Sequence, residues 1–115
     1  MIVWLMLACA GPAADSGGEC DREPPLTWSN FGQAWMNKHC NGCHGSLAVG
    51  DARHGAPEST NLDTWDDALR HAERVAARSL GDAPDMPPGG GPSEEERALL
   101  AEWLHCAAGV DGLTP

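Results

Sequence analysis

The segment Cys40-Asn41-Gly42-Cys43-His44 constrains the fold of this chain more than any other part of its sequence. Its C-x-x-C-H spacing is the attachment signature for c-type haem. Each thiol can add to one vinyl group of the haem, and the adjacent histidine then lies under the ring, where it can bind the iron. The sequence therefore predicts one covalently attached haem c, held by Cys40 and Cys43, with His44 as the proximal ligand of the haem iron.

Two other chemistries use a C-x-x-C pair. A thioredoxin-type redox pair requires a βαβ setting, and no strand-rich alternation lies near this segment. A structural zinc site needs further ligands, but Cys20, Cys106 and His39 do not form a second closely spaced pair. A zinc-binding lipoprotein that uses Cys40, Cys43 and a histidine remains the alternative without haem.

The length and charge of the chain limit its partners. Its 115 residues suit one compact domain, in which a haem would enlarge a modest apolar core. The net charge of −10 argues against nucleic acid as a partner, because such binding requires a basic surface. It favours redox protein partners with a basic docking patch, although an acidic surface also serves solubility alone.

The N-terminus has the pattern of a processing signal. Residues 1–8 form an apolar run that is too short to span a bilayer as a helix. This run resembles the end of a bacterial lipoprotein signal, with Leu7-Ala8-Cys9 as a lipobox. The resemblance implies cleavage before Cys9, a lipid anchor on Cys9 and a periplasmic protein held at a membrane. An ordinary export signal, cut at Ala8, Ala10 or Ala14, is the alternative. Residues 9–26 are rich in Gly, Pro and acids, and predict a flexible tether.

The cysteine count suggests a disulfide. If Cys40 and Cys43 hold haem and Cys9 carries lipid, Cys20 and Cys106 remain as a possible pair. Export implies an oxidising compartment in which such a pair would form. The pairings Cys9–Cys20 and Cys9–Cys106 stay open.

Apolar periodicity predicts an all-α fold. Helices are expected over residues 28–38, 64–80 and from Ser93 to about 108, with loops over 45–63 and 81–92. The expected N-caps are Thr27 or Ser29 for the first helix, Thr64 for the second, and Ser93 with Glu96 for the third. Gly109 is expected to end the last helix. The expected buried residues are Trp28, Phe31, Trp35 and Met36 in the first helix, Trp65, Ala68, Leu69, Ala72, Val75, Ala76 and Leu80 in the second, and Leu99, Leu100, Trp103, Leu104 and Ala107 in the third.

Over residues 27–108 this arrangement resembles the class I cytochromes c. In that family a helix leads into C-x-x-C-H, a Met lies in a Pro-rich loop, and a final helix crosses the first. The resemblance implies three to four short helices around one covalent haem, with 27–108 as the cytochrome c domain and 109–115 as a tail. It also implies that Gly32 contacts Trp103, with Leu100 beside them.

The same resemblance implies further ligands of the haem. Asp85-Met86-Pro87-Pro88 resembles the segment of the distal ligand, which makes Met86 the expected sixth ligand of the iron. Ala56-Pro57 resembles the loop whose Pro57 carbonyl accepts a hydrogen bond from the ring of His44. The competing sixth ligands are His54, His71, His105 and Met36. Candidate partners of the haem propionates are Trp65, Arg74 and Arg78, with Arg53 as a further one.

These features predict a periplasmic single-haem cytochrome that passes one electron between redox partners and is not an enzyme. A thioether opposite an imidazole raises the potential of the iron and suits such a carrier. The alternative is a haem enzyme or gas sensor with an open sixth site.

Overall fold

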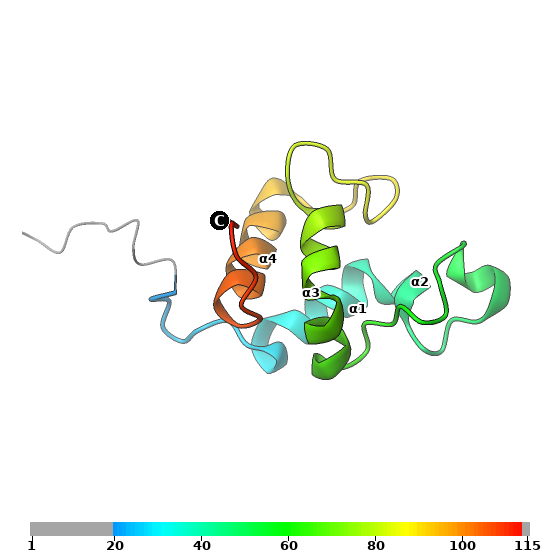
Figure 1. The fold of residues 1–115 in the computed structure, drawn as a ribbon, viewed down its shortest axis with the longest axis horizontal. Coiled ribbons are helices and arrows are strands. Elements are labelled where there is room, and N and C mark those ends of the chain that lie inside the picture. The colour runs from blue at the N-terminus through cyan, green and yellow to red at the C-terminus, as the bar shows by residue number, and fades with distance from the viewer. Residues whose placement is uncertain (1–19, 114–115) are drawn as a thin grey trace, which may run out of the picture.

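The computed structural model describes residues 20–113 and is helical there, with no strand in that range. Its elements, in chain order, are the π-helical turn η1 (Trp28–Gly32), α1 (Gln33–His39), α2 (Asn41–His44), the 3-10 turn η2 (Gly50–Arg53), α3 (Trp65–Ser79) and α4 (Glu94–Cys106). The predicted all-α class is confirmed. Figure 1 shows α3 and α4 as neighbouring helices that the long 81–92 loop connects. In the same view, α2 lies on the side of the domain opposite α4.

Side-chain caps fix where the helices begin. The Thr27 hydroxyl accepts from the Asn30 N–H (3.1 Å), and the Asn30 side chain accepts from the Thr27 N–H (2.7 Å). Ser93 and Glu96 form the same reciprocal pair at the start of α4, and Thr64 caps α3. Each cap satisfies backbone donors that lack partners in the first turn, and each lies at a predicted position.

The first predicted helix is divided in two. It begins with the wider turn η1, in which Gly32 N–H bonds Thr27 O (3.0 Å), and continues as α1 to His39. The short elements α2 and η2 were not predicted, because four residues carry too little periodicity to be recognised. The expected 45–63 loop therefore contains one 3-10 turn.

The core forms where α4 crosses the first helical segment. Its fully buried large side chains are Trp103, Met36, Leu100 and Leu104. A Cβ on Gly32 would lie 2.3 Å from Trp103 Cζ2, so the helices can approach this closely only at glycine. The predicted contact between Gly32 and Trp103 is confirmed.

The buried faces match the predicted periodicity in most positions. In α3, Ala68, Ala72, Val75 and Ala76 are buried, but Leu69 is 40% exposed because it lies at the edge of the apolar stripe. In α4, the buried residues are Leu100, Ala101, Trp103 and Leu104, whereas Ala107 lies past the helix end and is exposed.

The segment 20–26 lies against the domain, although a flexible tether was expected there. A disulfide joins Cys20 to Cys106, with the two Cα atoms 5.5 Å apart. Arg22 forms a bidentate pair with Glu102 of α4 (2.6 and 2.8 Å), and Leu26 packs against the core. These contacts attach the chain before η1 to the last helix.

The predicted C-terminal tail also returns to the domain. Gly109 adopts a left-handed φ of 73° after the end of α4, as a helix-terminating glycine does. Val110 N–H then bonds Leu104 O (3.0 Å), and Val110 is buried. Leu113 packs against the core.

The predicted signal segment 1–8 and Cys9 lie outside the described residues. Within residues 20–113, no helix has the length and apolar character needed to cross a membrane.

Candidate haem site

A cavity of about 480 Å³ lies beside the C-x-x-C-H segment. Its walls are α2, the loop from Arg53 to Leu62, one side of α3, and the loop that carries Met86. Cys40, Cys43, His44 and Met86 all line it, although 42 positions separate His44 from Met86. A volume of this order suits a cofactor-sized ligand.

The cavity is cationic in a strongly acidic chain. Lys38, Arg53, Arg74 and Arg78 line it, and no Asp or Glu of residues 20–113 does so. Cations along a cavity favour a ligand that carries negative charge. The carboxylates of haem propionates meet this requirement.

The two cysteines of the motif are not joined to each other or to any other cysteine of the described chain. Burial raises the pKa of the Cys40 thiol to about 12, whereas a dithiol redox pair works through a lowered thiol pKa. In addition, no group of three or more His, Cys, Asp or Glu residues within 20–113 is placed to hold a metal ion. The raised pKa of Cys40 disfavours the thioredoxin-type alternative.

The ring of His44 is oriented by a hydrogen bond at Nδ1. His44 Nδ1 lies 3.1 Å from Thr60 O, so Nδ1 carries the proton and Nε2 is left for a metal. The prediction for Pro57 is therefore corrected: the carbonyl at the histidine ring belongs to Thr60. The Pro57 carbonyl accepts instead from Thr60 N–H (3.0 Å) and from Arg53 Nη2 (2.7 Å), because the chain turns over 57–60.

The loop of Met86 is fixed through its backbone. Met86 N–H donates to Arg78 O (2.9 Å), and Met86 O accepts from Arg97 Nη1 (3.3 Å). Arg97 also donates to the carbonyls of Ser79 and Gly90. A guanidinium from α4 therefore holds both arms of the loop.

The four competing ligands occupy different environments. Met36 is fully buried in the helical core, and His105 Nδ1 lies 2.9 Å from Val110 O, away from the cavity. His54 and His71 do line the cavity. They are the residues against which Met86 has to be tested.

The model of a protein family described as "Cytochrome C oxidase, cbb3-type, subunit III" matches residues 30–104 of this chain. The chain belongs to this cytochrome c family. It is a c-type cytochrome domain, its cofactor is covalently attached haem c, and its general role is haem-based electron transfer. No curated protein and no solved structure matches the chain.

The residues of the cytochrome domain fit this cofactor. Cys40 and Cys43 supply the two thiols, His44 supplies an oriented imidazole, and the apolar part of the lining includes Leu62 and Val75. When bound, the haem supplies an iron that gains and loses one electron.

Of the predicted propionate partners, Arg74 and Arg78 line the cavity. Arg78 is also bonded to Asp85 through Nε (2.8 and 3.0 Å). Trp65 is not part of the lining, because it packs against Trp103 with ring centroids 5.5 Å apart. Arg53 is buried, and each nitrogen of its guanidinium already donates to acceptors of the protein. These two candidates are therefore corrected.

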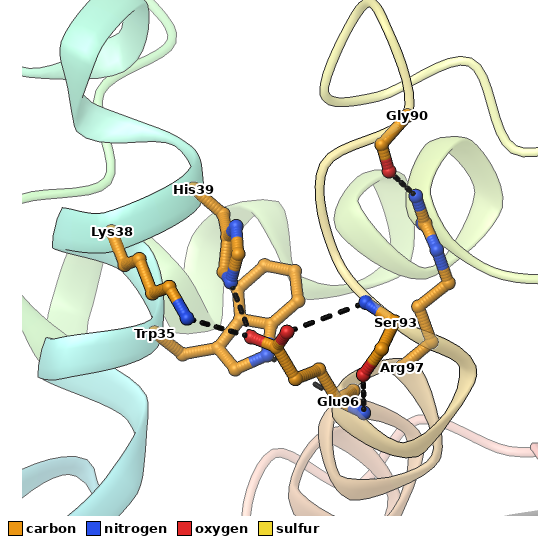
Figure 2. A network of polar contacts seen from close by, with 7 residues as sticks. All are labelled: Trp35, Lys38, His39, Gly90, Ser93, Glu96 and Arg97. Carbon is orange, nitrogen blue, oxygen red and sulfur yellow. Dashed lines mark hydrogen bonds and ion pairs between the residues drawn. The ribbon is translucent and has the colours of Figure 1, made fainter.

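Lys38 and His39, which line the cavity, are joined to α4 by a polar network centred on Glu96. Figure 2 shows this network. Glu96 Oε2 accepts from His39 Nε2 (2.7 Å) and Lys38 Nζ (3.3 Å), and its backbone carbonyl accepts from Trp35 Nε1 (3.3 Å). The His39 ring above all, then the Ser93 N–H and the Lys38 ammonium, lower the pKa of Glu96 to about 2. Sequence patterns indicated only the capping role of Glu96.

Proposed function

We propose that this chain is a periplasmic cytochrome with a single haem, whose iron is held by His44 and Met86 and which passes one electron at a time between redox partners. The observation that supports this most is that Met86 lines the same cavity as His44. No substrate bond changes in this role. The protein holds the cofactor, shields it from water and keeps both ligands in place in both oxidation states.

Met86 suits the sixth position because its segment is restrained. Its backbone N–H and C=O are both bonded, to Arg78 and Arg97, and Pro87 and Pro88 follow it. A residue with these restraints keeps its place when the charge of the iron changes, which favours fast electron exchange. A thioether ligand also raises the potential of the iron relative to a second nitrogen ligand.

A disulfide in the described part of the chain supports a periplasmic location. The Cys20–Cys106 disulfide requires an oxidising compartment. A lipid on Cys9 would then hold the domain at a membrane. Mass spectrometry of the mature protein tests this: a diacylated N-terminal Cys9 is expected, and an unmodified N-terminus at Asp15, after cleavage at Ala14, would contradict the anchor.

The partner is expected to be a redox protein with a basic patch, because the chain carries a net charge of −10. Electron-transfer rates to such a partner should fall as ionic strength rises. Rates that do not change with salt would exclude charge-guided docking.

The ligand assignment is tested with three alanine variants of protein matured with the haem-attachment machinery. Oxidised wild-type protein should show the weak sulfur-to-iron band at the red edge of its visible spectrum. Met86→Ala should lose this band, whereas the matched controls His54→Ala and His71→Ala should keep it. If wild-type protein lacks the band and binds carbon monoxide rapidly when reduced, the open-site alternative is correct.

A further inference from the structure

Arg53 is a buried cation that the proposed electron transfer does not yet explain. Its side chain is 4% exposed. It donates to six acceptors, all between residues 45 and 61: the carbonyls of Gly45, Ala48, Ala56, Pro57 and Thr60 and the side-chain oxygen of Asn61. No carboxylate of the described chain pairs with it. A charge buried without a counter-ion is costly.

Two of the bonds of Arg53 go to carbonyls next to the proximal histidine. Arg53 Nη1 donates to the carbonyl of Gly45, the residue after His44 (3.0 Å). Arg53 Nη2 donates to Thr60 O (3.2 Å), the same oxygen that lies 3.1 Å from His44 Nδ1. The guanidinium and the imidazole therefore share one acceptor, and both residues line the same cavity.

We propose that Arg53 is the positioning residue of the proximal side and that its unpaired charge raises the reduction potential of the iron. This inference rests on the proposed function, because it takes His44 as an axial ligand. The oxidised iron carries one more positive charge than the reduced iron, so a buried cation nearby disfavours the oxidised state. A carbonyl that already accepts from a cation is also a weaker acceptor for His44. The imidazole is then less anionic and stabilises oxidised iron less.

Both effects have the same sign, and one substitution weakens both without removing the guanidinium. Asn61 Oδ1 accepts from Arg53 Nη2 at 2.9 Å. Asn61→Asp keeps an acceptor oxygen at this position and gives Arg53 a counter-ion. The substitution also removes the hydrogen bond that Asn61 Nδ2 donates to Glu58 O (3.1 Å). The matched control is Asn37→Asp. Asn37 is exposed and away from the cavity, and its Oδ1 also accepts one side-chain bond, from Asn41 (2.8 Å).

The experiment is a redox titration of the haem-loaded variants. At a fixed electrode potential, Asn61→Asp should lower the ratio of reduced to oxidised protein about tenfold, which is ~59 mV for a one-electron couple. Asn37→Asp should change this ratio less than threefold. Equal shifts in the two variants would overturn the proposal.

A second readout follows the hydrogen bond itself. In reduced, ¹⁵N-labelled protein, the Nδ1–H proton of His44 should move downfield in Asn61→Asp, because Thr60 O becomes a stronger acceptor. A purely structural role of Arg53 would leave this resonance unchanged or move it upfield as the bond loosens, and either result would overturn the proposal.

A second pair of variants keeps the proposal testable if Asn61→Asp does not take up haem. Arg53→Gln should lower the same ratio about tenfold, whereas Arg53→Lys, which keeps the charge, should stay within about threefold of wild type. Arg70→Gln removes an exposed cation outside the cavity and is the control. Equal losses in Arg53→Gln and Arg53→Lys would contradict the argument from charge. Failure of the ligand assignment is recognised separately, by the absence of the sulfur-to-iron band in wild-type protein.

Discussion

Gly32→Ala tests the helix crossing on which the whole domain is built. A Cβ at this position would lie 2.3, 2.7 and 2.8 Å from three ring atoms of Trp103, whereas carbon atoms normally pack at about 3.5–4.0 Å. One of the two helices must therefore move by roughly 1 Å. Trp103 cannot yield alone, because it is fully buried between Trp28, Phe31 and Trp65.

The expected cost follows from two opposing effects. Overpacking of this kind costs about 1–3 kcal/mol, and the ring enclosed on all sides favours the upper end. Alanine gains about 0.5–1 kcal/mol over glycine in a helix. The net loss should be about 2 kcal/mol, which corresponds to a melting temperature lower by about 8–16 °C for a domain of this size.

Thermal unfolding of haem-loaded protein, followed by circular dichroism, measures this loss. The exposed Ala34 of α1 provides the matched control, since Ala34→Gly reports helix propensity without a steric change. In a Trp103→Leu background the cost of Gly32→Ala should disappear, because the clashing ring is gone. A Gly32→Ala protein as stable as wild type, or an unchanged cost in the Trp103→Leu background, would refute the reasoning.

Three further predictions follow from contacts around the site. Arg97→Gln removes the guanidinium from the carbonyls of Ser79, Met86 and Gly90 and should increase the rate of carbon monoxide binding to reduced protein about tenfold or more; Arg22→Gln, remote from that loop, should not. Because the pKa of Glu96 is lowered to about 2 from an ordinary 4.5, its contribution to stability is present above about pH 4.5 and is lost as the pH falls toward 2. In urea titrations Glu96→Gln should show a shallower loss of stability over that window, and an unchanged slope would contradict the network of Figure 2. Replacing both Cys20 and Cys106, which are 86 positions apart, by Ser should cost ~2–4 kcal/mol of unfolding free energy while the visible spectrum stays the same; a changed spectrum would show that the bridge also shapes the haem site.

Local signals in the sequence were sufficient for the helix starts. Thr27, Thr64 and Ser93 cap helices at their predicted positions because a cap involves residues only three apart. The crossing of Gly32 and Trp103 was predictable from resemblance to a known family, since neither residue alone identifies its partner. The change of turn type at Gly32 was not predictable, because the apolar positions suit a π-turn and an α-helix alike.

Features that depend on distant or irregular contacts were missed. The carbonyl at the ring of His44 belongs to Thr60 and not to Pro57, because the hydrogen bonds of the 57–60 turn decide which oxygen faces inward. Arg53 was expected only as a further candidate partner of the haem propionates, yet it is buried among six acceptors that only the folded loop brings together. The attachment of residues 20–26 depends on Arg22 meeting Glu102, 80 positions away.

X-ray absorption at the iron edge tests the central claim most directly, because it reports which atoms bind the iron in matured protein. With His44 and Met86 as axial ligands, the first shell should contain one sulfur atom in addition to nitrogen, in both the oxidised and the reduced protein. A shell of nitrogen and oxygen alone would contradict the ligand pair, and with it the proposal that this domain is a Met-ligated electron carrier.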